Sequence, residues 1–168
     1  MIDGTTTHPA RPAQADATVA LTSLLGIDLG EKRIGLAVGH LPSGRVTPLA
    51  TLRRGSLERD AATIARICGE QGISAIVVGL PLSMDGSDGP QARLTREWAS
   101  RLGVLVDLPL TLRDERLTSE AALSRMGRPP RGRAGGPPSS RSRTAWRARI
   151  DREAAVSIVQ AAMEALTP

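Results

Sequence analysis

The chain has 168 residues, a formal net charge of +5 and a single cysteine, Cys68. This length suits one domain with a substantial core, and a lone cysteine excludes both a disulfide framework and a cysteine-based zinc site. No apolar run approaches the length of a membrane span. We therefore expect a cytoplasmic protein with one domain over residues 23–168. Residues 1–22, rich in Thr, Ala and Pro and unlike a signal peptide, are expected to form a disordered tail.

The first predicted elements are three strands joined by short turns. Residues 24–30 predict a buried strand with one carboxylate, Asp28, on the same face as two glycines. Residues 33–39 predict a second strand in an antiparallel hairpin. Residues 46–52 predict a third, which Pro48 assigns to a sheet edge. An ionised Asp in a buried strand is costly unless a cation or hydrogen bonds meet it, so Asp28 either serves a ligand or caps the following turn.

The next segments change from the strand period to the helical period. A helix is predicted between an N-cap at Ser56 and a C-cap at Gly72. A continuous apolar run over residues 75–78 predicts a central strand. A second helix is predicted from residue 87 or 88 to residue 102. Its core-facing residues are expected to be Leu94, Trp98 and Leu102.

A fifth strand is predicted over residues 104–112, followed by a short helix ending at Met126. Glycine, proline and arginine dominate residues 127–149, which we predict to be a flexible basic loop. The final helix is predicted to begin at Asp151. This order of elements predicts an α/β fold with a five-stranded mixed sheet, made of a three-strand antiparallel meander and two strands parallel to the first, with helices on both faces.

Arginine supplies almost all of the positive charge. Of 22 basic residues only Lys32 is a lysine, and residues 121–150 contain eight arginines and no acid. Such a block attracts polyanions, and arginine can bind phosphate through two hydrogen bonds; the alternative is a solvated arginine-rich loop. With two Trp and no Phe or Tyr, base stacking is not expected, so contact would be to a nucleic-acid backbone. The candidate contact residues are Lys32, Arg33, Arg116, Arg128, Arg131, Arg133, Arg141 and Arg143.

Acidic residues stand at three places that folding could bring together. Asp28 lies on the first strand, Asp114 and Glu115 follow the last strand, and Asp151 falls on the apolar side of its helix. Their oxygens suit Mg²⁺ or Mn²⁺, and such a cluster can support phosphodiester hydrolysis. Each has a structural alternative: Asp151 as an N-cap, Asp114 as a cap of the next helix, and Glu115 paired with a neighbouring arginine. The residues leave open whether Asp114 or Glu115 faces a metal.

Five sets of motifs, in order along the chain, together resemble the bacterial YqgF/RuvX family. They are Gly26-Ile27-Asp28-Leu29-Gly30, Lys32-Arg33-Ile34-Gly35, Val78-Gly79-Leu80-Pro81 with Met84-Asp85-Gly86-Ser87, Asp114-Glu115-Arg116-Leu117-Thr118, and Ile150-Asp151 with Ala154-Ala155. The resemblance covers about residues 24–166 and implies a ribonuclease H-like fold. It implies a cytoplasmic nuclease, classed first as a Holliday junction resolvase and later as a nuclease that processes the 5′ end of pre-16S rRNA in ribosome biogenesis. Carried over by motif, Asp28, Glu115 and Asp151 would be the catalytic, metal-binding acids, with Asp114 as a further candidate.

The leading hypothesis is therefore an endonuclease that uses Mg²⁺ or Mn²⁺ and acts on structured RNA. A second hypothesis keeps the chemistry but takes four-way DNA junctions, whose symmetric cleavage needs two active sites. Because neither a coiled-coil heptad nor an apolar dimer patch is readable, we expect a monomer or weak homodimer. A third is a nucleic-acid-binding factor without catalysis. The motif at residues 26–30 also resembles the phosphate loop of actin-like kinases and ATPases, but those need two lobes and this chain has length for one.

Overall fold

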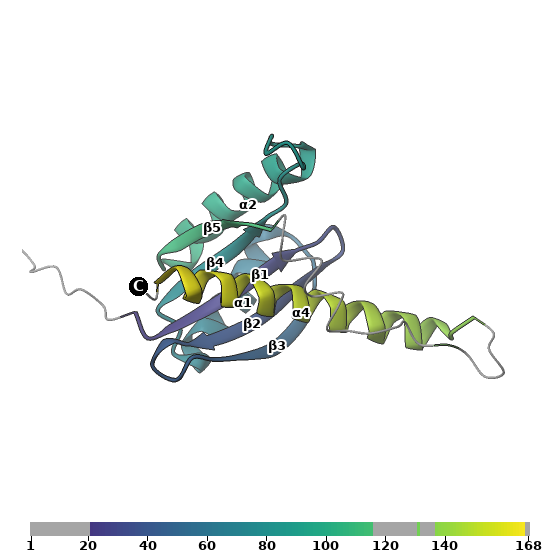
Figure 1. Ribbon diagram of the computed structural model, residues 1–168, viewed down its shortest axis with the longest axis horizontal. Coiled ribbons are helices and arrows are strands. Elements are labelled where there is room, and N and C mark those ends of the chain that lie inside the picture. Colours follow the sequence, from purple (N-terminus) through teal and green to yellow (C-terminus); the bar gives the residue numbers. More distant parts are fainter. Residues whose placement is uncertain (1–20, 116–130, 132–136, 167–168) are drawn as a thin grey trace, which may run out of the picture.

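The structure is a computed structural model that describes residues 21–115, 131 and 137–166 (Figure 1). Its elements are β1 (Ser23–Leu29), β2 (Arg33–His40), the 3₁₀ turn η1 (Leu41–Ser43), β3 (Arg45–Arg53), α1 (Leu57–Gln71), β4 (Ala75–Leu80), α2 (Pro90–Val106), β5 (Leu110–Asp114) and α4 (Ser140–Leu166). The predicted short helix ending at Met126 lies outside the described residues, as does the predicted tail up to residue 20. None of the described helices is long and apolar enough to cross a membrane.

The strands form one sheet in the order β3-β2-β1-β4-β5. β1 pairs with β2 and β2 with β3 in antiparallel fashion, whereas β4 runs parallel to β1 and β5 parallel to β4. The predicted mixed sheet, with its meander and two parallel strands, is confirmed. β3 lies at the edge, as Pro48 indicated, and the register shifts beside that proline, which faces Ala37.

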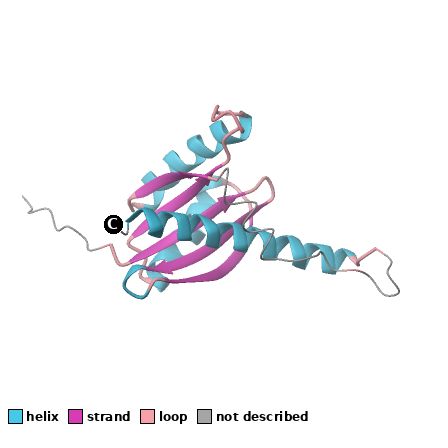
Figure 2. Ribbon diagram, viewed as in Figure 1, coloured by secondary structure: helices cyan, strands magenta, loops and turns pink. Residues whose placement is uncertain are grey.

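Helices cover both faces of the sheet (Figures 1 and 2). On the face covered by α1 and α2, the sheet presents large branched side chains such as Ile27, Leu36 and Ile76, which join Ile64 of α1 and Leu102 of α2 in one apolar core. α4 crosses the opposite face, and its N-terminal half extends beyond the sheet (Figure 1). The alternation predicted for β1 is confirmed: Leu25, Ile27 and Leu29 join the core under α1 and α2, whereas Leu24 and Gly26 face α4.

Small residues line the face beneath α4 and let the helix backbone approach the sheet. A Cβ on Gly26 would lie 2.8 Å from the carbonyl oxygen of Ala155. Gly35 of β2 pairs with Asp28 of β1, and the position of its missing Cβ is already filled by the backbone carbonyl of Asp151. This close approach requires glycine at both positions. It also brings Asp151 next to the strand pair that carries Asp28.

The predicted ends of α1 are confirmed. Ser56 Oγ accepts a hydrogen bond from the Arg59 N–H at 3.4 Å, which satisfies one free donor of the first turn. Gly72 adopts a left-handed conformation with φ of 59°, and its N–H bonds to the carbonyls of Cys68 and Gly69. Glycine tolerates this conformation without a steric cost, so the helix ends there.

The predictions for α2 and β5 were partly wrong. Residues 104–106, predicted as the start of a strand, are the last turn of α2, and β5 begins only at Leu110. Asp107 ends the helix in the left-handed region, with φ of 55°, and Pro109 follows. Trp98 and Leu102 are buried as predicted, but Leu94 is 54% exposed. The buried face of α2 carries Thr95, Trp98 and Leu102, which leaves Leu94 facing solvent.

The last helix begins at Ser140, and the prediction of a start at Asp151 was wrong. Residues 140–149 of the predicted loop are therefore helical. Ser139 caps the first turn: its Oγ accepts from the Ser142 N–H at 3.1 Å, and its carbonyl from the Arg143 N–H at 3.0 Å. Most of the added turns extend beyond the sheet into solvent, and only their end near Ala148 reaches β3. They therefore need no apolar stripe and give no periodic signal. Asp151 lies inside the helix and is not its N-cap.

Candidate active site

The carboxyl ends of the parallel strands meet around Asp28. Asp28 is the second-to-last residue of β1, Gly79 lies at the corresponding end of β4, and Glu115 directly follows β5. A cavity of about 360 Å³ opens at this edge of the sheet, where open α/β sheets bind their ligands. Its lining residues are Asp28, Leu29, Gly30, Glu31, Gly79, Pro81, Gln91 and Glu115.

Glu115, and not Asp114, faces this cavity. Asp114 is the exposed last residue of β5 and is absent from the cavity lining. The Glu115 N–H donates to the Leu80 carbonyl at 3.1 Å, which fixes its backbone beside β4. Its carboxylate occupies the space above Gly79, where a Cβ would overlap it. Gly79 therefore provides the room that the Glu115 carboxylate uses.

Burial and nearby negative charges raise the pKa values of Asp28 and Glu115. Removal from water raises the pKa of Asp28 to about 7; the charge of Asp151 adds to this rise and that of Arg33 opposes it. Burial also raises the pKa of Glu115 to about 8, with further contributions from Asp28 and Asp114. Two acids in such surroundings cannot both ionise easily without a compensating positive charge. The cavity therefore favours a bound proton or a bound cation.

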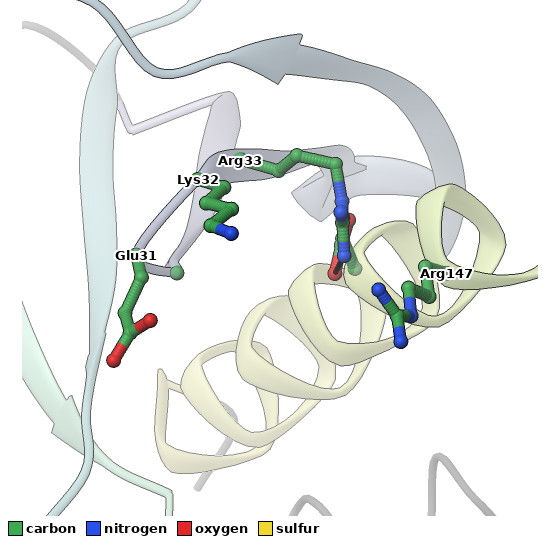
Figure 3. A pocket seen from close by; sticks show the side chains of 6 residues that line it. Glu31, Lys32, Arg33 and Arg147 are labelled. Atoms are coloured by element: carbon green, nitrogen blue, oxygen red, sulfur yellow. Dashed lines mark hydrogen bonds and ion pairs between the residues drawn. The ribbon is translucent and has the colours of Figure 1, made fainter. Parts of the chain in front are cut away.

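Asp151 lies in a second cavity, of about 330 Å³, which shares Gly30 and Glu31 with the first. Lys32, Arg33 and Arg147 line it as well (Figure 3). Arg33 Nε donates to Asp151 Oδ2, and Arg33 Nη2 donates to Oδ1 at 3.4 Å, so a two-point ion pair holds this carboxylate. In the part of the chain that the structure describes, no three His, Cys, Asp or Glu side chains form a group that could hold a metal ion. Folding thus brings Asp28 and Glu115 into one cavity and Asp151 into the adjoining one.

Five of the eight predicted nucleic-acid contacts fall within the described residues. Lys32 and Arg33 follow β1 and line the second cavity. Three more are exposed to solvent: Arg131, Arg141 and Arg143. The remaining three lie outside the described residues: Arg116, Arg128 and Arg133.

Two residues near the site were missed by sequence reasoning. Gln91 of α2 lines the first cavity and donates from Nε2 to the Leu29 carbonyl at 3.4 Å; its position in the sequence gave no signal for this contact. Arg147 lines the second cavity from α4. It precedes Asp151 by four residues, a spacing that places both on one helix face, so recognition of the helix would have identified it.

The raised pKa values predict that the metal-free protein loses stability as pH rises. The folded state binds the Glu115 proton up to about pH 8, whereas an unfolded glutamate releases it near pH 4. Between these values unfolding releases a proton, so a higher pH favours the unfolded state. We expect Glu115→Gln to remove part of this slope and to stabilise the protein at pH 8 by about 1–2 kcal/mol. Urea unfolding in EDTA between pH 5 and pH 9 measures both effects.

The matched control is Glu164→Gln, which neutralises an exposed glutamate on α4 that does not line the cavity. This variant should keep the pH slope of the wild type. Equal slopes for the wild type and Glu115→Gln would show that Glu115 is not a buried weak acid.

The chain has clear relatives among known proteins. Residues 22–165 match the family model RuvX, described as "Holliday junction resolvase". A protein of Bradyrhizobium sp. is 41% identical over 145 residues, which cover 86% of this chain and 84% of its own. A protein of Rhodobacter capsulatus is 44% identical over 114 residues, which cover 66% of this chain and 72% of its own. Both relatives are named "Putative pre-16S rRNA nuclease".

Solved structures share the fold at low sequence identity. RuvC of Thermus thermophilus, in complex with a Holliday junction substrate, aligns with a TM-score of 0.52 at 13% identity, covering 86% of this chain and 95% of that one. The fowlpox virus Holliday junction resolvase aligns with a TM-score of 0.51 at 12% identity, covering 86% and 99%. These likenesses confirm the predicted ribonuclease H-like fold.

Proposed function

Since the chain belongs to the RuvX family and is a nuclease, and so a hydrolase, we propose that it is a metal-dependent endonuclease that processes the 5′ end of pre-16S rRNA in ribosome biogenesis. The observation that carries this proposal is the pair of half-buried carboxyl groups, Asp28 and Glu115, in one cavity at the strand ends. The adjoining cavity adds Asp151 and three cationic side chains. The RNA substrate is proposed from relatives that are more than 40% identical and are named for it.

The acids of the site fit a divalent cation. Asp28 and Glu115 present hard oxygen donors, and their pKa values are raised because burial and nearby negative charges disfavour the ionised forms. We assign Asp28, Glu115 and Asp151 as the catalytic residues that would hold Mg²⁺ or Mn²⁺; Asp114 would act on the site only through its charge. A divalent ion bound there supplies the positive charge that activates water and stabilises the leaving oxygen of a phosphodiester.

Other side chains fix the turn that joins the two cavities. Arg54 Nη1 donates to the Gly30 carbonyl at 3.1 Å, and Gln91 bonds the preceding carbonyl, that of Leu29. These bonds hold the turn that carries Lys32 and Arg33 beside the carboxylates. In this proposal Lys32 and Arg33 bind substrate phosphates, since charge-assisted bonds to phosphate are strong and directional.

The basic segment before α4 and the projecting half of α4 would extend the contact with nucleic acid. Arg141, Arg143, Arg147 and Arg149 are exposed on that half, and residues 116–136 contribute further arginines by sequence. We propose that the chain acts in the cytoplasm as one nuclease domain over residues 23–168, as a monomer or weak homodimer.

Four-way DNA junctions are the second candidate substrate. The family description names a Holliday junction resolvase, and the fold is shared with RuvC bound to such a junction. A junction needs two cuts and therefore two active sites, which a weak homodimer would have to provide.

A direct comparison of substrates tests the proposal. Purified protein is incubated with an RNA spanning the 5′ end of pre-16S rRNA and, separately, with a four-way DNA junction, each in Mg²⁺, Mn²⁺ or EDTA. We expect cleavage of the RNA at a defined position, in the presence of either metal ion and not in EDTA. Cleavage of the junction alone would establish the second candidate, and binding of both without any cleavage would establish a non-catalytic factor.

A further inference from the structure

The second cavity is lined by more cationic than acidic side chains. Lys32, Arg33 and Arg147 line it against two acids, Glu31 and Asp151. In Figure 3 Lys32 and Arg33 extend from the turn toward α4, Arg147 extends from α4 toward them, and Glu31 points away. Only Arg33 is paired: neither Lys32 nor Arg147 takes part in an ion pair of the described residues. Two uncommitted cations therefore face a cavity of about 330 Å³.

Arg33 is placed to contact either Asp151 or a ligand in this cavity. Its Nε and Nη2 are directed at Asp151, which leaves the other N–H groups of the guanidinium for a second partner. The Arg33 side chain is 29% exposed and that of Asp151 is 16% exposed. The pair is thus accessible from the cavity, and an entering anion would compete with Asp151 for the same donors.

We propose that this cavity binds a phosphate of the nucleic-acid strand and that Arg33 exchanges Asp151 for that phosphate, which releases Asp151 to the metal ion. The inference rests on the proposed function, because it takes Asp151 as a metal ligand. A phosphodiester matches the cavity for two reasons. Arginine binds phosphate oxygens in the same two-point geometry that it uses for a carboxylate. Lys32 and Arg147, which are not paired with Asp151, add positive charge that attracts the phosphate.

The exchange makes Arg33 a positioning residue for the metal site. While Arg33 holds Asp151, only two of the three predicted metal-binding acids, Asp28 and Glu115, line the first cavity, in agreement with the lack of a three-acid group among the described residues. Once a phosphate occupies Arg33, Asp151 is free to turn toward Asp28. Phosphate and metal ion then strengthen each other's binding, and thermodynamic linkage makes this coupling reciprocal. The metal site is completed when the substrate arrives.

Metal binding without cleavage tests the exchange. The affinity for Mn²⁺ is measured by calorimetry for the wild type and for Arg33→Gln, with and without a short RNA whose methylene-phosphonate linkages resist hydrolysis. Without RNA we expect Arg33→Gln to bind Mn²⁺ about tenfold more tightly than the wild type, because Asp151 is already released. Adding the RNA should raise the Mn²⁺ affinity of the wild type about tenfold and leave that of Arg33→Gln nearly unchanged.

Two controls separate the exchange from other effects. Arg96→Gln removes a comparable two-point pair with Asp88, at 2.8 and 3.1 Å, on the exposed side of α2, and should behave as the wild type does. Arg147→Gln removes a positive charge from the same cavity but leaves the Arg33–Asp151 pair intact. It should weaken RNA binding and change the Mn²⁺ affinity much less than Arg33→Gln. Equal Mn²⁺ affinities for these two cavity variants would mean that charge alone acts, and would overturn the proposal.

Other results of these measurements would refute the exchange, the metal dependence or the proposed substrate. The exchange is wrong if Arg33→Gln and the wild type bind Mn²⁺ equally, or if RNA raises the affinity of both by the same factor. Arg33→Lys, which can pair with Asp151 through one point only, should be intermediate and serves if Arg33→Gln fails to fold. A protein that binds no Mn²⁺ under any condition would refute the metal-dependent function itself. A protein that shows the coupling but does not cut pre-16S rRNA would refute only the proposed substrate.

Discussion

Asp28→Asn is expected to reduce nuclease activity about a thousandfold, equivalent to about 4 kcal/mol of transition-state stabilisation, while RNA binding stays close to that of the wild type. Asn keeps the size of Asp and one of its oxygens but removes the charge that a divalent cation would meet at the centre of the site. Asp28 contributes to the cavity next to Glu115 and is electrostatically coupled to Asp151. Single-turnover cleavage in Mg²⁺ measures the loss, and fluorescence anisotropy in EDTA measures binding.

The folded structure should tolerate this substitution and even gain from it. Because burial raises the pKa of Asp28 to about 7, its ionised form destabilises the metal-free protein at higher pH, and the neutral amide avoids that cost. The control is Asp107→Asn at the end of α2, where the left-handed conformation suits Asn. Asp107→Asn should cleave as the wild type does. Undiminished cleavage by Asp28→Asn would place the reaction at another site.

Gly35→Ala is expected to lower the free energy of unfolding by about 3 kcal/mol. The added Cβ would fall on the carbonyl group of Asp151. A backbone carbonyl cannot rotate aside as a flexible side chain can, so α4 must move off the sheet and lose packing along its C-terminal half. Urea unfolding measures the loss. Since the same movement displaces Asp151, cleavage should fall even under conditions where the variant is folded.

Gly69→Ala makes the same chemical change in the opposite context. Gly69 lies in α1, and a Cβ there would meet nothing within 4 Å. Alanine is the better helix former, so this variant should be more stable than the wild type by about 0.5–1 kcal/mol. Opposite signs for the two substitutions would verify the tight contact between α4 and β2. A Gly35→Ala variant as stable as the wild type would contradict it.

Hydrophobic periodicity and capping residues correctly predicted most of the strands and helices that pack into the core. The strand carrying Asp28 alternates cleanly because one of its faces meets α1 and α2 and the other meets α4. The ends of α1 follow from Ser56 and Gly72, which satisfy backbone groups locally. By contrast, apolar residues 104–106 suggested a strand although they continue α2, because a short apolar run does not distinguish the two structures. The first turns of α4 gave no signal because solvent surrounds them.

The candidate site was predicted in part, since the motifs singled out Asp28, Glu115 and Asp151 but gave no geometry. Strand alternation could not choose between Asp114 and Glu115, because both lie beyond the predicted strand over residues 104–112. In the structure, the bond from the Glu115 N–H to β4 and the space above Gly79 make that choice. The Arg33–Asp151 pair joins residues 118 positions apart. Such a contact depends on how closely α4 packs on β2, which no local pattern reveals.

The projecting half of α4 affects the length of nucleic acid that the protein can contact. Residues 140–150 form three turns of helix, which span roughly 16 Å at the usual rise. This stiff helical segment carries Arg141 and Arg143 outward from the two cavities, whereas Arg147 still lines the second cavity. Arginines at that distance would bind phosphates several nucleotides away from the bond that is cleaved. A short RNA that ends near that bond should therefore bind more weakly than a longer one, because it releases fewer counterions.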